Sequence, residues 1–186
     1  MDRRSFGATL LMGTLGAAAA PALAQFRPNR PDMMPMGPAE ERHALDTLAI
    51  GAVALETSRL ARDRALRPAV RQFAQFEAEE QSAVAEIIRE MMGPVAPPPP
   101  SRRDARMVAD LGRLRGAAFD RMYITGQVDG HRRLLDVQDR YLNDGRNLHH
   151  RHIAILARGR IREHLADLER LQNRTAERGP VRSPGA

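Results

Sequence analysis

Residues 93–116 read GPVAPPPPSRRDARMVADLGRLRG and separate two longer segments that both have helical periodicity. The Gly-Pro pair at the start predicts the end of a helix, and the prolines at 97–100 favour a stiff, extended linker. Ser101 followed by Asp104 is typical of a helix N-terminus, so a short helix is expected to about residue 114. A connection of this length allows the segments on either side to form two separate helical hairpins.

Two helices joined by a tight turn are expected before this connection. Pro38 suits the first position of a helix, and the pattern predicts that helix over 38–67. Pro68 breaks it and can begin the second helix, predicted over 68–92. The predicted inward stripe of the first helix is Leu45, Leu48, Ala49, Ala52, Val53, Glu56 and Leu60. The corresponding stripe of the second helix is Val70, Phe73, Glu77, Glu80, Val84, Ile87 and Met91.

Two further helices are expected after the connection, over 117–143 and 147–175, with Asn147 as the N-cap of the last one. The stripe of the third long helix is Asp120, Ile124, Val128, His131, Leu135, Gln138 and Leu142. The stripe of the fourth is Ile153, Ala157, Ile161, His164, Leu168 and Leu171. The sequence therefore predicts an all-α domain over 38–175. It would be a ferritin-like four-helix bundle of two antiparallel hairpins joined by a long crossover that contains a short extra helix.

The N-terminus of this 186-residue chain has the features of a signal peptide. Arg3 and Arg4 precede an uncharged stretch, and Ala-Leu-Ala at 22–24 predicts cleavage before Gln25. Because Arg-Arg-Ser-Phe also resembles the twin-arginine signal, that route and the general secretory route both stay open. We expect an exported, periplasmic protein, with outer-membrane association as a further option. A flexible lead-in rich in Pro and Met is expected over 25–37, and a disordered tail over 176–186.

Each long helix has a carboxylate or imidazole on its apolar stripe: Glu56, Glu80, His131 and His164. A buried charged group needs an ion pair, hydrogen bonds or a metal ion. One hypothesis is a metal site for iron, zinc, manganese or copper in the bundle core. The alternative is a set of core residues paired with arginines such as Arg59 or Arg160.

The spacing restricts the metal hypothesis. Measured from the turns, Glu56 and Glu80 lie nearly level, but the two histidines differ by about five residues, or roughly 7 Å along the axis. One ion held by both histidines would require offset or kinked helices. A di-iron site would require Glu-x-x-His on two helices, and Ala83 and Ile161 stand at the positions that would complete it. Classical di-iron chemistry is therefore disfavoured.

Three segments together resemble a known family: GAAFDRMY at 116–123, VDGH at 128–131 and REHL at 162–165. They are similar to an exported, ferritin-like bacterial family catalogued as domain-of-unknown-function family 4142. The resemblance implies that the family's polar pattern falls on Glu56, Asp120, Tyr123, His131 and His164. This chain departs from that pattern with Glu80-Gln81 in place of Asp-His, and with Gly130 in place of Asp. The resemblance implies fold and export, and no established activity.

Composition excludes several classes of function. The chain has no Cys, so it has no thiolate metal ligand, cysteine nucleophile or lipidated cysteine anchor. All 29 basic residues are Arg and the net charge is +6, but scarce aromatics and expected export argue against nucleic acid. Association with an anionic envelope surface is the better interpretation of the basic segment 102–115. The methionines at 33–36 and the histidines at 149–152 are weaker metal candidates.

The first functional hypothesis is a non-catalytic binding or stress-related protein of the cell envelope. The alternative is a metal-binding or metal-redox protein with its site in the bundle core. A third option is a bundle that assembles into oligomers through its helix faces. The N-terminal stretch is rich in Gly and Ala and too weakly hydrophobic for a transmembrane helix. No transmembrane span is expected in the mature chain either.

Overall fold

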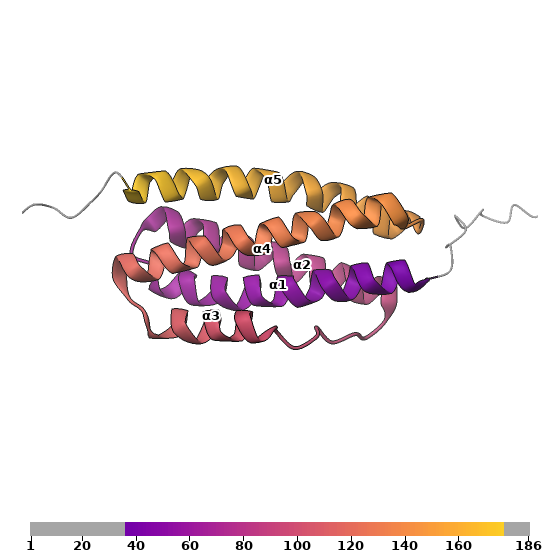
Figure 1. Cartoon of the computed structure of the whole chain (residues 1–186), viewed down its shortest axis with the longest axis horizontal. Coiled ribbons are helices and arrows are strands. Elements are labelled where there is room, and N and C mark those ends of the chain that lie inside the picture. The colour runs from indigo at the N-terminus through magenta and orange to yellow at the C-terminus, as the bar shows by residue number, and fades with distance from the viewer. Residues whose placement is uncertain (1–35, 177–186) are drawn as a thin grey trace, which may run out of the picture. The chain divides into compact units, whose positions relative to one another are not determined.

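Helices account for most of the chain that the computed structural model describes, residues 36–176 (Figure 1). They are α1 (Pro38–Arg64), α2 (Pro68–Met92), α3 (Arg102–Arg113), α4 (Gly116–Asp144) and α5 (Leu148–Ala176). No strand occurs in that part of the chain, which confirms the prediction of an all-α fold. The expected signal peptide (1–24), residues 25–35 of the lead-in and residues 177–186 of the tail lie outside the described residues.

Prolines and polar caps set the helix ends, as the sequence predicts. Arg67 is extended, as a residue before proline prefers, and Pro68 occupies the first turn of α2. The Ser101 hydroxyl accepts a hydrogen bond from the amide of Asp104 at 3.1 Å and caps α3. The Asn147 side chain accepts one from the amide of His149 at 3.1 Å and caps α5. α1 ends at Arg64, before the predicted residue 67, because Ala65 is already extended.

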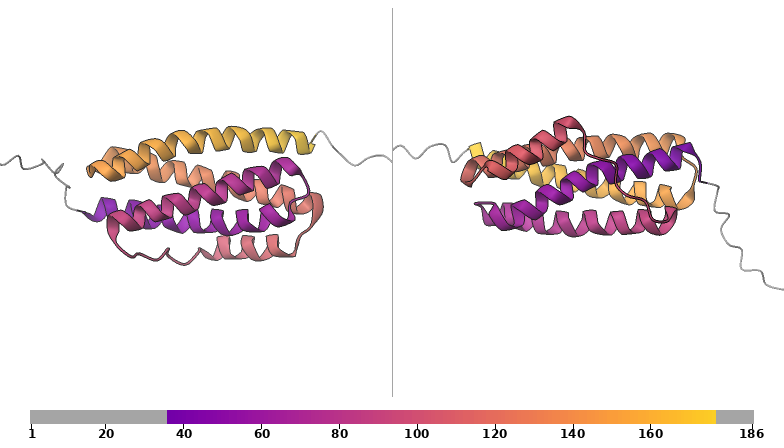
Figure 2. Two further views of the ribbon diagram at one scale, coloured as in Figure 1. Left: turned by 180° about the vertical axis from the view of Figure 1, so that it is seen from behind. Right: turned by 90° about the horizontal axis from the view of Figure 1, so that it is seen from below.

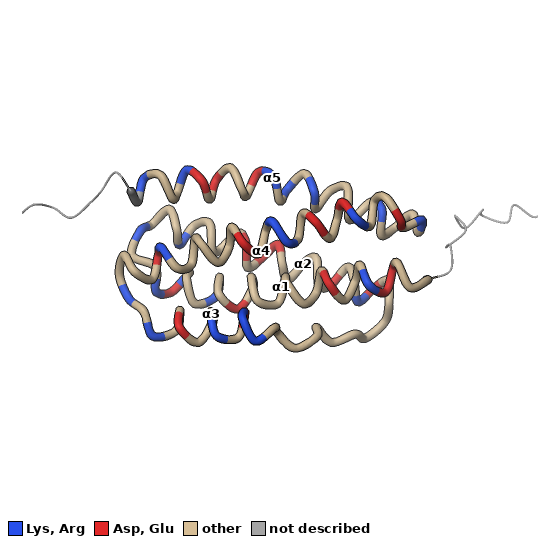
Figure 3. The backbone as a smooth tube through the Cα atoms, in the orientation of Figure 1, with Lys and Arg blue, Asp and Glu red and all other residues tan. Residues whose placement is uncertain are grey.

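The four long helices form two antiparallel hairpins, α1–α2 and α4–α5 (Figures 1 and 2). α1 also packs along α4, whereas α2 and α5 touch at few places. The crossover passes beside α1 and brings α3 against α1 and α4. Acidic and basic residues are interspersed along α4 and α5 (Figure 3). No described helix has the length and apolar character that a membrane span needs.

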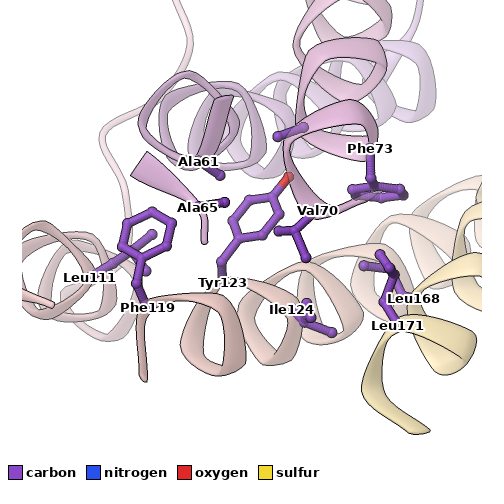
Figure 4. Packing of buried hydrophobic residues seen from close by; sticks show 11 residues of the cluster. Ala61, Ala65, Val70, Phe73, Leu111, Phe119, Tyr123, Ile124, Leu168 and Leu171 are labelled. Atoms are coloured by element: carbon purple, nitrogen blue, oxygen red, sulfur yellow. The ribbon is translucent and has the colours of Figure 1, made fainter. Parts of the chain in front are cut away.

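The larger apolar cluster joins all five helices (Figure 4). Its buried members are Ala61, Ala65, Val70, Phe73, Ala74, Leu111, Phe119, Tyr123, Ile124, Leu168 and Leu171. Leu111 brings α3 into this core, and Arg133 of α4 holds α3 by hydrogen bonds of 2.8 and 3.1 Å to Asp104. A smaller cluster of Ala44, Leu48 and Ile88 lies between α1 and α2. Much of the remaining interior is polar.

A buried carboxylate on α4 holds the turn between α1 and α2. Asp120 is 1% exposed and accepts hydrogen bonds from the amides of Leu66 at 2.8 Å and Arg67 at 3.1 Å. The Arg67 guanidinium adds a contact of 3.2 Å from Nε. Asp120 of the α4–α5 hairpin therefore supplies the hydrogen-bond acceptor that the backbone amides in the α1–α2 turn require.

Glu40 of α1 performs the equivalent role for the turn between α4 and α5. Its Oε1 accepts hydrogen bonds from the Tyr141 hydroxyl at 2.9 Å and from the amides of Arg146 and Asn147, both at 3.2 Å. Burial alone would raise the pKa of Glu40, but these donors lower it to about 2. The two carboxylates thus connect the hairpins at opposite ends of the bundle.

We expect Glu40→Gln to lower the free energy of unfolding at neutral pH by about 2 kcal/mol, because a charged acceptor of several hydrogen bonds is lost. The folded pKa of Glu40 lies below its usual value of 4.5, so its stabilisation is complete above that pH. It is lost as the pH falls toward 2. Denaturant unfolding across this range should therefore show a smaller loss of stability on acidification for the variant than for the wild type. Glu41→Gln, at the exposed neighbour, is the control, and an equal acid dependence of wild type and Glu40→Gln would contradict the assignment.

Candidate metal centre

Three ionisable side chains from three helices meet inside the bundle. They are Glu77 of α2, His131 of α4 and His164 of α5, which are 0%, 1% and 4% exposed. Glu77 Oε2 lies 2.9 Å from His164 Nδ1 and 3.4 Å from His131 Nε2. The two imidazole nitrogens are 3.1 Å apart. Among the described residues, this is the group of acidic and histidine side chains whose donor atoms converge closely enough to hold one ion.

Hydrogen bonds on the far side of His131 and of Glu77 orient these two groups toward the centre. His131 Nδ1 lies 2.8 Å from the Gln127 carbonyl oxygen, which can only accept, so Nδ1 carries a hydrogen. In the neutral ring, Nε2 therefore presents its lone pair to the centre. Glu77 Oε1 accepts a hydrogen bond of 3.0 Å from Gln81 Nε2, which leaves Oε2 to face the histidines.

His164 is oriented by an acid outside the centre. Its Nε2 faces Glu80 Oε2 at 3.6 Å, while Nδ1 faces Glu77. Glu80 is fixed in turn by Arg160, whose Nε lies 2.8 Å from the same oxygen. A carboxylate behind a histidine is a common way to fix the ring of a metal ligand.

The charge of Glu77 and the charge of His131 depend on each other. Burial alone would raise the pKa of Glu77, but the two imidazoles lower it to about 2, so the carboxylate is ionised. Burial alone would lower the pKa of His131, but Glu77 raises it above its usual value. A positive charge next to Glu77 Oε2 is therefore strongly favoured. In the chain alone a proton on an imidazole supplies that charge.

The donor set and its spacing also fit one metal ion. Donors about 2.1 Å from a zinc ion lie about 3.0 Å apart at right angles and about 3.4 Å apart in a tetrahedron. The three separations of 2.9, 3.1 and 3.4 Å span this range without movement of any helix. Glu77 Oε2 is fully buried and faces the two imidazole nitrogens at 2.9 and 3.4 Å. A metal ion between the three atoms could replace the proton that the imidazoles otherwise supply.

A family model for a domain of unknown function, DUF4142, matches residues 27–171 of the chain. The chain belongs to the DUF4142 family. This confirms the family resemblance found in the sequence, and the match covers the whole of the site. No curated protein and no solved structure matches the chain.

Two of the four predicted ligands of this DUF4142 chain meet at the centre. His131 and His164 are in contact, and Glu80 lies behind His164. Glu56 does not reach the centre, because it lies on the exposed face of α1. The prediction placed it on an inward stripe of larger apolar residues, but the buried face of α1 consists mainly of small and polar ones. These include Ala44, Thr47, Gly51, Ala54, Thr57, Ser58 and Ala61.

The axial offset predicted between the histidines is removed by the direction of their side chains. In an α-helix the Cα–Cβ bond tilts toward the N-terminus. His131 in α4 therefore leans away from the α4–α5 turn, whereas His164 in α5 leans toward it. The rings meet although the residues stand at different distances from the turn.

Two other members of the family's polar pattern have structural contacts. Asp120 holds the α1–α2 turn, and the Tyr123 hydroxyl lies 2.9 Å from the Ser58 hydroxyl within the apolar core (Figure 4). Burial raises the pKa of Tyr123, so its hydroxyl stays protonated. Asp120 is not among the converging donors.

A second buried histidine pair was not predicted. His43 Nδ1 lies 2.9 Å from His150 Nδ1, and His43 Nε2 lies 2.7 Å from Gln138 Oε1. Burial lowers the pKa of both histidines, to about 4 for His150, so both rings are neutral. The sequence marks His150 only as one of the histidines at 149–152, although the predicted Asn147 cap fixes the start of α5 and hence its buried face.

A groove of about 350 Å³ between α2 and α5 passes beside the centre. Phe73 and His164 are among its lining residues, and Glu77 and His131 are not. The Phe73 ring packs edge-on against the His164 ring, with centroids 5.2 Å apart. Of the three donor residues, His164 alone lines this groove.

Proposed function

We propose that this DUF4142 protein binds one divalent first-row transition metal ion through Glu77 Oε2, His131 Nε2 and His164 Nδ1. Two imidazoles and one carboxylate form a known donor set for zinc and iron(II). Calcium and magnesium prefer oxygen ligands throughout and suit this set poorly. Copper and manganese are the other candidates among the metals considered from the sequence.

The convergence of the three donor atoms is the main support for this proposal. Three donor atoms from separate helices converge, and hydrogen bonds behind Glu77 and His131 turn Oε2 and Nε2 toward the shared centre. The ionised, fully buried carboxylate favours a cation beside its Oε2, where the two imidazole nitrogens lie at 2.9 and 3.4 Å. A divalent ion would satisfy all three donors at their present separations.

Metal storage or metal-dependent stabilisation fits the site better than catalysis. The three ligands are almost completely buried, and of them only His164 lines the nearest groove. Three protein ligands leave one coordination position to water, but ligands this deeply buried give a substrate little access to it. This supports the hypothesis of a non-catalytic binding protein, with the metal ion as the bound species.

The site also favours a mononuclear centre within a ferritin-like plan. Ligands that project inward from facing helices are the arrangement that ferritin-like bundles use. A second ion would need a further carboxylate, but Glu80 is paired with Arg160 at 2.8 Å. We infer that the bundle is related to that class and differs from its di-iron members.

We further propose that the protein acts in the periplasm after removal of residues 1–24, on the basis of the N-terminal sequence. Mass spectrometry of the protein from fractionated native cells should find it in the periplasmic fraction with Gln25 as its first residue. An intact N-terminus at Met1 in the cytosolic fraction would refute this localisation.

We expect the chelator-treated protein to take up one equivalent of Zn²⁺ or Co²⁺ in isothermal titration calorimetry. Glu77→Gln and His164→Ala should each weaken binding at least about tenfold, because one of only three protein donors is lost. Bound metal should also raise the melting temperature of the wild type, since the ion binds the folded chain.

Two variants are matched controls for this titration. Glu56→Gln removes a carboxylate, and His152→Ala removes an imidazole, at exposed positions. Both should bind metal as the wild type does. Absence of metal binding by the wild type, or unchanged affinity after loss of Glu77 or His164, would refute the proposed centre.

A further inference from the structure

α1 supplies no donor to the centre, yet it contacts the side chain that positions Glu77. Gln81 lies four residues after Glu77 on α2 and is 7% exposed. Its Nε2 donates to Glu77 Oε1 at 3.0 Å. The amide oxygen of the same side chain faces Gly51 of α1.

The space at Gly51 is what admits the Gln81 amide. A Cβ atom at position 51 would lie 2.6 Å from Gln81 Oε1, which is closer than a carbon and an oxygen can approach. The contact involves the end of a flexible side chain, so an added methyl group would displace the amide and leave the helices in place. Glycine within a helix costs about 1 kcal/mol relative to alanine, so helix stability alone does not favour it.

We propose that Gly51 and Gln81 are positioning residues that restrict Glu77 to metal coordination through one oxygen. With Oε1 held by the Gln81 amide, only Oε2 faces the two histidines. Without that amide the carboxylate can rotate and offer both oxygens to the ion. The inference rests on the proposed metal site and adds that α1 determines the coordination number there.

Cobalt(II) titrations of the full chain test this inference, because the visible absorption of Co²⁺ becomes weaker as its coordination number rises. We expect Gly51→Ala and Gln81→Ala each to weaken Co²⁺ binding about tenfold or more and to weaken the visible bands. The double variant should resemble Gln81→Ala alone, since Gly51 acts through Gln81. Without metal, Gly51→Ala should keep the helical circular dichroism spectrum and the cooperative thermal unfolding of the wild type, so that a loss of structure cannot explain its weaker binding.

Gly130→Ala is the matched control. It makes the same substitution inside a helix, at a buried position adjacent to His131, where a Cβ would meet only Ile50 Cγ2 at 3.9 Å. Its affinity and its Co²⁺ spectrum should equal those of the wild type.

The outcomes separate this inference from the proposed function. If the wild type binds Co²⁺ and the two single variants match its affinity and spectrum, the positioning role is wrong and the metal site stands. Equal effects of Gly51→Ala with and without Gln81 would also overturn it. If the wild type binds no Co²⁺, both proposals fail. Should Gly51→Ala unfold the protein, an unchanged spectrum of Gln81→Ala would be sufficient to refute the inference.

Discussion

The ionised carboxylate of Glu77, fully buried at the meeting point of three helices, is the constraint on which the interior depends. A charge in that position is costly unless a cation lies beside it. The two histidines and the residues behind them form a layer arranged to provide one. This layer interrupts the apolar packing of the bundle, and the same side chains form the proposed metal site.

Two other buried carboxylates hold the helices around this polar layer in place. Asp120 and Glu40 each cross from one hairpin to hold the turn of the other, at opposite ends. They fix the relative height of the hairpins, which determines whether Glu77 of α2 meets His131 and His164 of the α4–α5 hairpin. The interaction of α3 with Arg133 fixes the crossover against the same helices. The geometry of the centre is therefore maintained from the ends of the bundle.

The elements of the fold could be predicted because prolines, glycines and polar caps mark the helix ends directly. The site could be predicted only in part. Both histidines stand among large apolar residues on their helices, so their burial followed from periodicity. Glu56 was misplaced because α1 faces the interior with small and polar residues such as Gly51 and Ser58, which give little hydrophobic signal. Glu77 lay on the predicted stripe beside Glu80, but periodicity alone does not rank two acids one turn apart.

Whether one ion binds between the three donors can be tested by X-ray diffraction from crystals of the zinc-loaded protein, recorded at the zinc absorption edge. We expect one strong anomalous peak about 2.1 Å from each of Glu77 Oε2, His131 Nε2 and His164 Nδ1. A fully soaked crystal with no peak at this position would contradict it. A peak confined to the exposed His149 and His152, or to the His43–His150 pair, would contradict it equally.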